Sequence, residues 1–214
     1  MDKTKQQKGR GPGNPMGPSS GVVAGNLRKV RLNRGLTLQD VAERLTERGR
    51  TMTTSAVSKI ERAERRVDVD DLTALAAVLG VTPTDLLMPV ATDGPLLTGL
   101  PEGLTVEDVD AWLLGKAELT REALADYWLH EADRTRMFMA ADVRAYKAAQ
   151  AKDEKDRYLE RVQMQQSTVA RDRDRAVEHL RAAGVLEPGQ GYDDIPGDYL
   201  PQVIDLTELG VTDA

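Results

Sequence analysis

Residues 36–61 read LTLQDVAERLTERGRTMTTSAVSKIE, and this stretch decides the fold of the first part of the chain. Apolar side chains recur at helical spacing in 38–45 and again in 56–60, and a polar connector separates the two runs. Thr37 and Asp40 stand three residues apart, which is the spacing of a capping box at a helix start. The stretch therefore predicts two short amphipathic helices joined by a turn.

The second helix of this pair has a polar outer face. Its apolar residues Ala56, Val57 and Ile60 are expected to face the core. The residues left for the outer face and the helix start carry short hydroxyls and one ammonium: Thr53, Thr54, Ser55, Ser58 and Lys59. Such a face has the size and chemistry of a helix that enters the major groove of DNA.

Three further helices are expected to complete a compact block over residues 26–89. Capping residues, left-handed glycines and a proline at the first helical position mark their ends. The first is expected from Asn26 to Gly35, with Leu27, Val30 and Leu32 as its apolar residues. The fourth is expected over 72–79, opened by Asp68 or Asp70, and the fifth from Thr82-Pro83 to Leu87.

Short segments in this block occur in a characteristic order: Leu27-Arg28, Leu36-Thr37, 41–45, 55–62, Leu72, Leu75-Ala76, 79–81 and 85–87. In that order and register, residues 26–87 resemble the helix-turn-helix domain of phage-repressor-type (XRE family) regulators. The resemblance implies a five-helix bundle whose third helix, at about 53–63, reads the major groove. It also implies a symmetric dimer on a pseudo-palindromic operator.

The sequence departs from that family in three places. The family often has Gln where its second helix opens, whereas Leu38 stands at the matching position with Gln39 beside it. The connector between the second and third helices is longer than usual, and its Arg48 and Arg50 are candidates for phosphate or for solvent. Ala63 stands where the family commonly has Gly, so we expect the third helix to run further.

The predicted DNA contacts follow from the outer face of the third helix. We expect Thr54, Ser55 and Lys59 to contact base edges, because hydroxyls and an ammonium can hydrogen-bond to groups in the major groove. Cationic and hydroxyl side chains around them suit the phosphate backbone. The predicted phosphate contacts are Arg28, Thr53, Ser58, Arg62, Arg65 and Arg66.

Some of these residues have an alternative role that the sequence leaves open. Either threonine at the start of the third helix can serve only as its N-cap. Arg65 and Arg66 can instead pair with neighbouring carboxylates on the surface. Glu61 is expected to be structural and to hold Arg44 or a helix end, because a carboxylate repels phosphate.

Charge is distributed unevenly along the 214 residues, whose net charge is −6. Residues 1–89 hold 15 Lys and Arg against 10 Asp and Glu, whereas residues 90–214 hold 14 against 25. A basic first part and an acidic second part suit a protein that touches phosphate with one end only, although random surface charge is the plainer reading. There is no 18-residue apolar run and no Cys, which excludes a membrane span and a disulfide scaffold, and a cytoplasmic location is expected.

The chain outside residues 26–89 is expected to fall into four segments. Residues 1–25 are rich in Gly and Pro and predict a disordered basic tail, either a loose arm on DNA or a solvated tail. Residues 90–104 indicate a linker, and residues 185–214 a flexible acidic tail. Between them, residues 105–184 are expected to be a helical dimerisation segment.

This segment is expected to begin with a short helix capped by Thr105 and stopped near Gly115. No Gly or Pro occurs in 116–183, which favours one long C-terminal helix. A weak heptad pattern predicts a coiled-coil homodimer, with an intramolecular hairpin or a solvated single helix as the alternatives. The pattern consists of Val162, Gln166, Val169, Arg173, Ala176 and Leu180.

No arrangement of residues predicts catalysis, a metal or a cofactor, and His130 and His179 lie far apart. The expected fold class is all-α, with a five-helix helix-turn-helix bundle followed by a long C-terminal helix. The expected function is a DNA-binding transcriptional regulator, specifically a repressor, acting as a homodimer on double-stranded operator DNA. The alternative is a helical interaction or scaffold protein that works through its C-terminal helix. The sequence does not indicate whether a small-molecule effector exists.

Overall fold

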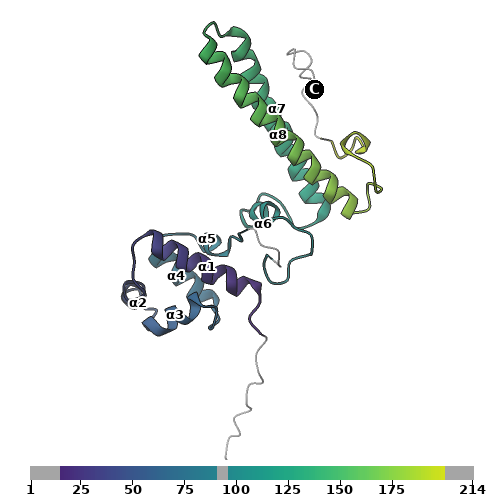
Figure 1. Cartoon of the computed structure of the whole chain (residues 1–214). Helices are drawn as coiled ribbons and strands as arrows, with labels where there is room; N and C mark the ends of the chain where they lie inside the picture. The colour runs from purple at the N-terminus through teal and green to yellow at the C-terminus, as the bar shows by residue number, and fades with distance from the viewer. Residues whose placement is uncertain (1–14, 91–95, 201–214) are drawn as a thin grey trace, which may run out of the picture. The chain divides into compact units, whose positions relative to one another are not determined.

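The computed structural model describes residues 15–90 and 96–200, in which all regular elements are helical. The chain divides into two compact units at residue 114 (Figure 1). The first unit contains α1 (Pro18–Asn33), α2 (Leu38–Glu47), α3 (Thr54–Glu61), α4 (Val69–Leu79), α5 (Pro83–Leu87) and α6 (Val106–Leu113). The second unit contains α7 (Arg121–Ala148), α8 (Lys152–Ala182) and a 3-10 turn, η1 (Tyr192–Asp194). No helix in the described ranges is both long and apolar enough to cross a bilayer.

Helix α1 begins earlier than the sequence pattern indicated. Residues 18–25, which we expected in a disordered tail, form its first half, with Pro18 at the first helical position. Val23 and Ala24 are buried there, and this burial offsets the low helix propensity of the neighbouring glycines. Leu32, which we counted among the apolar residues of this helix, is 55% exposed and does not contribute to the core. Residues 1–14 of the expected tail lie outside the described residues.

Asn26 lies in the middle of α1 and is not the helix cap that we expected. Its side-chain amide donates to the carbonyl oxygens of Leu86 at 3.1 Å and Met88 at 2.7 Å. These two carbonyls belong to the end of α5, where no further turn of helix satisfies them. Asn26 therefore joins the first and fifth helices of the bundle.

Helices α1 to α5 pack around one apolar core, as the sequence predicted. Complete burial of a Leu, Ile or Val side chain contributes roughly 1.5–3 kcal/mol each, so this core is the main source of stability of the bundle. The side chains with no exposed surface come from all five helices: Leu27, Val41, Leu45, Val57, Ile60, Leu75, Leu79 and Leu86.

The capping box predicted at the start of α2 is present. The Asp40 amide donates to the Thr37 hydroxyl at 3.1 Å, and the Thr37 amide donates to the Asp40 carboxylate at 2.7 Å. That backbone hydrogen bond is the main cause that lowers the pKa of Asp40. The same Thr and Asp arrangement opens α5 and α6, at Thr82 with Asp85 and Thr105 with Asp108. Local sequence therefore fixes where these helices begin.

Residues 96–104, expected as a linker, are built of turns that contact α1. Leu97 is buried, and the Thr98 amide donates to the Ser19 hydroxyl at 2.9 Å. Helix α6 follows and buries Val109 and Ala111. Part of the expected linker is thus packed against the helix that opens the chain's first unit.

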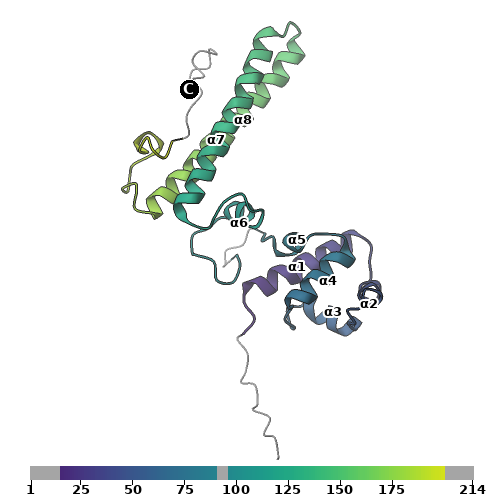
Figure 2. The same cartoon turned by 180° about the vertical axis from the view of Figure 1, so that it is seen from behind.

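The long C-terminal segment folds back on itself as a hairpin. Helices α7 and α8 lie side by side in both views (Figures 1 and 2), so the segment forms an intramolecular hairpin and not a single continuous helix. The bend at residues 149–151 contains neither Gly nor Pro, and Ala149 and Ala151 take ordinary extended conformations. Helix-favouring composition alone therefore did not reveal the bend.

Much of the seam that we expected to join two chains is used within this hairpin. Val169, Ala176 and Leu180 of α8 are buried, whereas Gln166 is exposed. Farther along, the seam becomes polar: buried Asp142 of α7 accepts from Gln165 Nε2 at 2.8 Å. An intramolecular partner therefore satisfies much of the heptad pattern.

Residues 185–200, expected to belong to a flexible acidic tail, pack onto the hairpin instead. Leu186 and Ile195 are buried in one apolar cluster with Trp128 and Leu180. The Arg173 guanidinium also lies 4.0 Å from the ring centroid of Tyr192, a cation–π distance. This segment is thus part of the core of the second unit, and the remainder of the predicted tail, 201–214, lies outside the described residues.

Candidate nucleic-acid interface

The outer face of α3 carries the residues predicted to contact base edges. Val57 and Ile60 have no exposed surface and fix the inner face of the helix. Ser55 and Lys59 are exposed and lie one turn apart on the opposite side. The hydroxyl and ammonium groups therefore face outward, where the edge of a base can reach them.

Thr53 is the N-cap of α3, which was one of the two roles left open for it. Its hydroxyl accepts from the Ala56 amide at 3.2 Å, and its backbone is extended. The hydroxyl proton remains available as a donor, and unpaired amides at a helix start attract anions. Capping and contact with a phosphate are therefore compatible at this residue.

Gln39 is the residue of α2 that reaches α3. The Thr54 hydroxyl donates to Gln39 Oε1 at 3.4 Å, and Gln39 Nε2 donates to Glu43 at 2.8 Å. Leu38, which stands at the family's Gln position, packs against the apolar core instead. Gln39 is exposed, so the rotation of α2 turns this residue outward and Leu38 inward.

Helix α3 ends at Glu61, earlier than we expected from the absence of Gly at position 63. Ala63 takes the left-handed conformation with φ 53°, although it has a side chain that disfavours it. Its amide donates to the Ile60 carbonyl at 2.9 Å, and the Glu64 amide donates to the Lys59 carbonyl at 2.8 Å. These bonds close the helix and turn the chain toward α4.

Two of the predicted phosphate contacts, Ser58 and Arg62, are joined to each other. Arg62 Nη1 donates to the Ser58 hydroxyl at 2.7 Å, and its other guanidinium nitrogens bind Glu64 at 2.8 and 2.9 Å. This pairing raises the pKa of Arg62 and lowers that of Glu64. Both side chains are about half exposed, so the pair is weak enough to rearrange against a phosphate.

Glu61 has the structural role that we expected, but with a different partner. Its carboxylate accepts from Arg31 Nε at 2.6 Å and Arg31 Nη2 at 2.8 Å, and both side chains are buried. Hydrogen bonding to Glu61 raises the pKa of Arg31. Arg44, the expected partner, donates instead to the Val78 carbonyl at 3.5 Å. The last residue of α3 is thereby fixed to α1.

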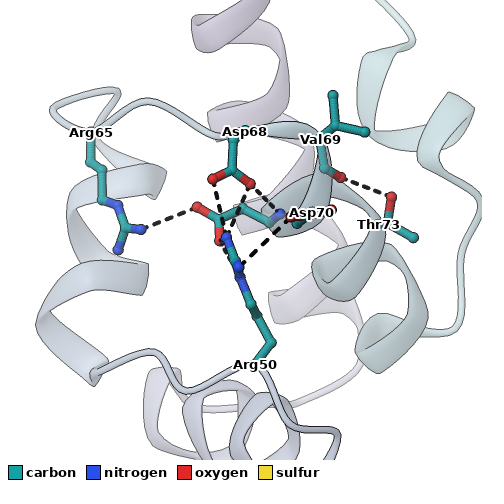
Figure 3. Close-up of polar contacts among 7 residues, drawn as sticks. Arg50, Arg65, Asp68, Val69, Asp70 and Thr73 are labelled. Carbon is teal, nitrogen blue, oxygen red and sulfur yellow. Dashed lines mark hydrogen bonds and ion pairs between the residues drawn. The ribbon is translucent and has the colours of Figure 1, made fainter.

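Arg50 and Arg65 do not project freely toward a ligand. Figure 3 shows both guanidinium groups directed at carboxylates near the start of α4. Arg65, a predicted phosphate contact, donates to Asp71 at 3.1 Å; it therefore has a carboxylate partner, but a buried one and not the surface carboxylates that we expected as the alternative. The sequence did not point to Asp71, and Arg31, which we expected to face outward from its helix, is buried instead; their partners Arg50 and Glu61 lie 21 and 30 residues away.

Arg28 and Arg66 are exposed and make no ion pair among the described residues. Lys59 is also exposed, and its charge helps to lower the pKa of Glu64. At the start of α3, Glu43 and Glu47 line a hollow together with Thr53 and Thr54. Since carboxylates repel phosphate, the exposed cations at the end of α3 and on α1 suit the DNA backbone better than this hollow does.

Within residues 15–90 and 96–200, no group of three or more His, Asp or Glu side chains is placed to hold a metal ion. A family model described as helix-turn-helix matches residues 27–86. No curated protein and no solved structure matches the chain. The matched range covers α2 to α4 entirely and ends within α5. Residues 27–86 are thus a helix-turn-helix domain of the phage-repressor (XRE) type, a domain of DNA-binding regulators.

Proposed function

We propose that this protein is a sequence-specific transcriptional repressor that inserts α3 into the major groove of double-stranded operator DNA. The observation that carries the proposal is the outer face of α3, where Ser55 and Lys59 are exposed on a helix whose other face is completely buried. A helix with short hydroxyls can approach base pairs closely, and a long cationic side chain can reach guanine acceptors.

The residues around α3 divide into two roles in this proposal. Thr54, Ser55 and Lys59 contact base edges, with Gln39 orienting the Thr54 hydroxyl. Contacts to phosphate come from the start of α3, from its end and from α1: Thr53, Ser58, Arg62, Arg66 and Arg28. We leave Arg65 out of this set because Asp71 already binds its guanidinium.

Repression follows from occupancy, since a bundle that covers an operator excludes other proteins from it. Two copies would bind two half-sites about one helical turn apart, which requires a homodimer. Because much of the expected seam is already buried between α7 and α8, we place the contact between copies on the outer surface of the hairpin. Met137, Phe138 and Met164 are exposed there, at 49%, 63% and 66%. Analytical ultracentrifugation of the full chain should show a dimer at concentrations that bind DNA.

Selection from random duplexes by the full chain tests the function. We expect one motif to be enriched, and Lys59→Ala to weaken binding to that motif by about 1–3 kcal/mol while binding to scrambled DNA changes little. Lys29→Ala, which removes the same charge from the exposed surface of α1, is the matched control. Equal losses on both DNAs would make Lys59 a phosphate contact, and the absence of any enriched motif would favour the scaffold alternative.

A further inference from the structure

Asp71 lies in the first turn of α4 and binds two arginines from different parts of the chain. Its side chain is 2% exposed. One carboxylate oxygen accepts from Arg50 Nε at 2.8 Å and lies 2.6 Å from Arg50 Nη2 as an ion pair, and the other accepts from Arg65 Nη2 at 3.1 Å. A buried carboxylate that satisfies both of its oxygens in this way is held in one geometry.

The two arginines flank α3 along the chain. Arg50 belongs to the connector that leads into α3, and Arg65 belongs to the connection that leaves it (Figure 3). Asp68 strengthens the first of these links, because both of its oxygens accept from Arg50 Nη2 at 3.1 Å. One cluster at the start of α4 therefore joins the chain before α3 to the chain after it.

The cluster also explains how a longer connector is compatible with a fixed helix. A loop of the length of 48–53 has many conformations, and ordering each residue costs about 1–2 kcal/mol of chain entropy. The hydrogen bonds of Arg50 to Asp68 and Asp71 hold the middle of that loop. The pKa of Arg50 is raised, mainly by its hydrogen bond to Asp71.

We propose that Asp71 is a positioning residue for DNA recognition: it sets the orientation of α3 through Arg50 and Arg65, and thereby the sequence selectivity, without touching DNA. This inference rests on the proposed function. In this inference, Arg50 and Arg65 support α3. If every arginine near α3 were taken as a DNA contact, both would be assigned to phosphate instead.

The variant Asp71→Asn separates the two assignments because they predict opposite signs. The substitution removes a negative charge and releases two guanidinium groups, so a purely electrostatic role predicts tighter binding to every duplex and a steeper dependence on salt. A positioning role predicts that affinity for the selected motif falls by roughly tenfold while affinity for scrambled DNA is kept or rises slightly.

Asp70→Asn is the matched control. Asp70 is the adjacent residue, its side chain is 85% exposed, and its carboxylate is 4.0 Å from Arg50, so the charge change is the same while the cluster remains. We expect the ratio of selected to scrambled affinity to stay at the wild-type value in Asp70→Asn and to fall in Asp71→Asn. Equal ratios in the two variants would overturn the inference.

A second pair of variants keeps the test decisive if Asp71→Asn does not fold. Arg65→Lys retains a charged donor for Asp71 and should retain most of the selectivity, whereas Arg65→Ala should lose it. Amide chemical shifts of α3 should move in Arg65→Ala and return toward wild type in Arg65→Lys. A uniform loss of affinity for all DNA in Arg65→Ala, with a smaller salt slope, would show a phosphate contact and contradict the inference. A wild-type protein without any selectivity would instead contradict the proposed function itself.

Discussion

The helix-turn-helix bundle and the α7–α8 hairpin bury charged side chains in different ways. In the bundle, buried Arg31 and Asp71 each bind partners in or next to α3 and fix its position. In the hairpin, buried Asp142 of α7 binds Gln165 and Arg161 of α8, and buried Asp172 pairs with Arg175 of its own helix. Among the described residues, the buried Oε1 of Gln165 accepts no hydrogen bond, and the buried Nε of Arg173 donates none. The comparison teaches that the buried charges of the bundle connect α3 and its flanking residues to α1 and α4, whereas those of the hairpin make polar contacts within a helix pair.

The largest effect is expected from Glu61→Ala, which breaks the buried pair with Arg31. The guanidinium would remain buried without its carboxylate, so the bundle should lose about 3–5 kcal/mol of unfolding free energy. Hydrogen exchange resolved to α1–α4 measures this loss. Glu64→Ala removes the same charge three residues later from a half-exposed pair, and it should cost less than about 1 kcal/mol. Equal losses of unfolding free energy in the two variants would contradict the claim that the buried pair stabilises the bundle more than the half-exposed pair does.

Asp142→Ala should destabilise the hairpin by a smaller amount, about 1–3 kcal/mol. Gln165 would lose its acceptor, whereas Arg161, the other partner, is 57% exposed and can return to water. Hydrogen exchange in α7 and α8 reports the change. Asp156→Ala, at an exposed position of α8, serves as the control and should stay within about 0.5 kcal/mol of wild type. A loss in Asp142→Ala as large as that in Glu61→Ala would show that the hairpin depends on its charges as strongly as the bundle does.

Glycine substitutions at the two connections should have opposite signs. Ala63→Gly should stabilise the bundle by about 0.5–1 kcal/mol, because the left-handed conformation at φ 53° is strained for Ala and free for Gly. Ala149→Gly should destabilise the hairpin by a similar amount, because its φ of −63° suits any residue and Gly adds disorder to the unfolded chain. Thermal unfolding of both variants checks the signs, and stabilisation in both cases would contradict the conformational argument.

The features that the sequence predicted are those that depend on local spacing. Thr37 with Asp40, and Thr105 as a cap, mark helix starts from residues within one turn, so no tertiary information is needed. The start of α1 was not predicted because Gly21 and Gly25 lower the helix propensity there, and burial of Val23 and Ala24 stabilises the helix only in the folded bundle. Pro18 at the first helical position was the available signal.

The features that escaped prediction join residues far apart or depend on a choice between partners. Nothing near Glu61 in the sequence indicates Arg31, and the role of Asp71 needs the folded α4 in place. The bend at 149–151 could not be located because Ala and Gln favour helix on either side of it. A heptad pattern is the same whether the partner helix comes from the same chain or from another, so the pattern alone did not select the hairpin.

The central claim is that α3 lies in the major groove, and methylation interference on the selected duplex tests it most directly. Dimethyl sulfate marks guanine N7 in the major groove and adenine N3 in the minor groove of the same DNA. We predict that N7 methylation within the enriched motif blocks binding of the full chain, while N3 methylation there leaves it unchanged. Interference confined to adenine N3, or binding that ignores both marks, would contradict the account.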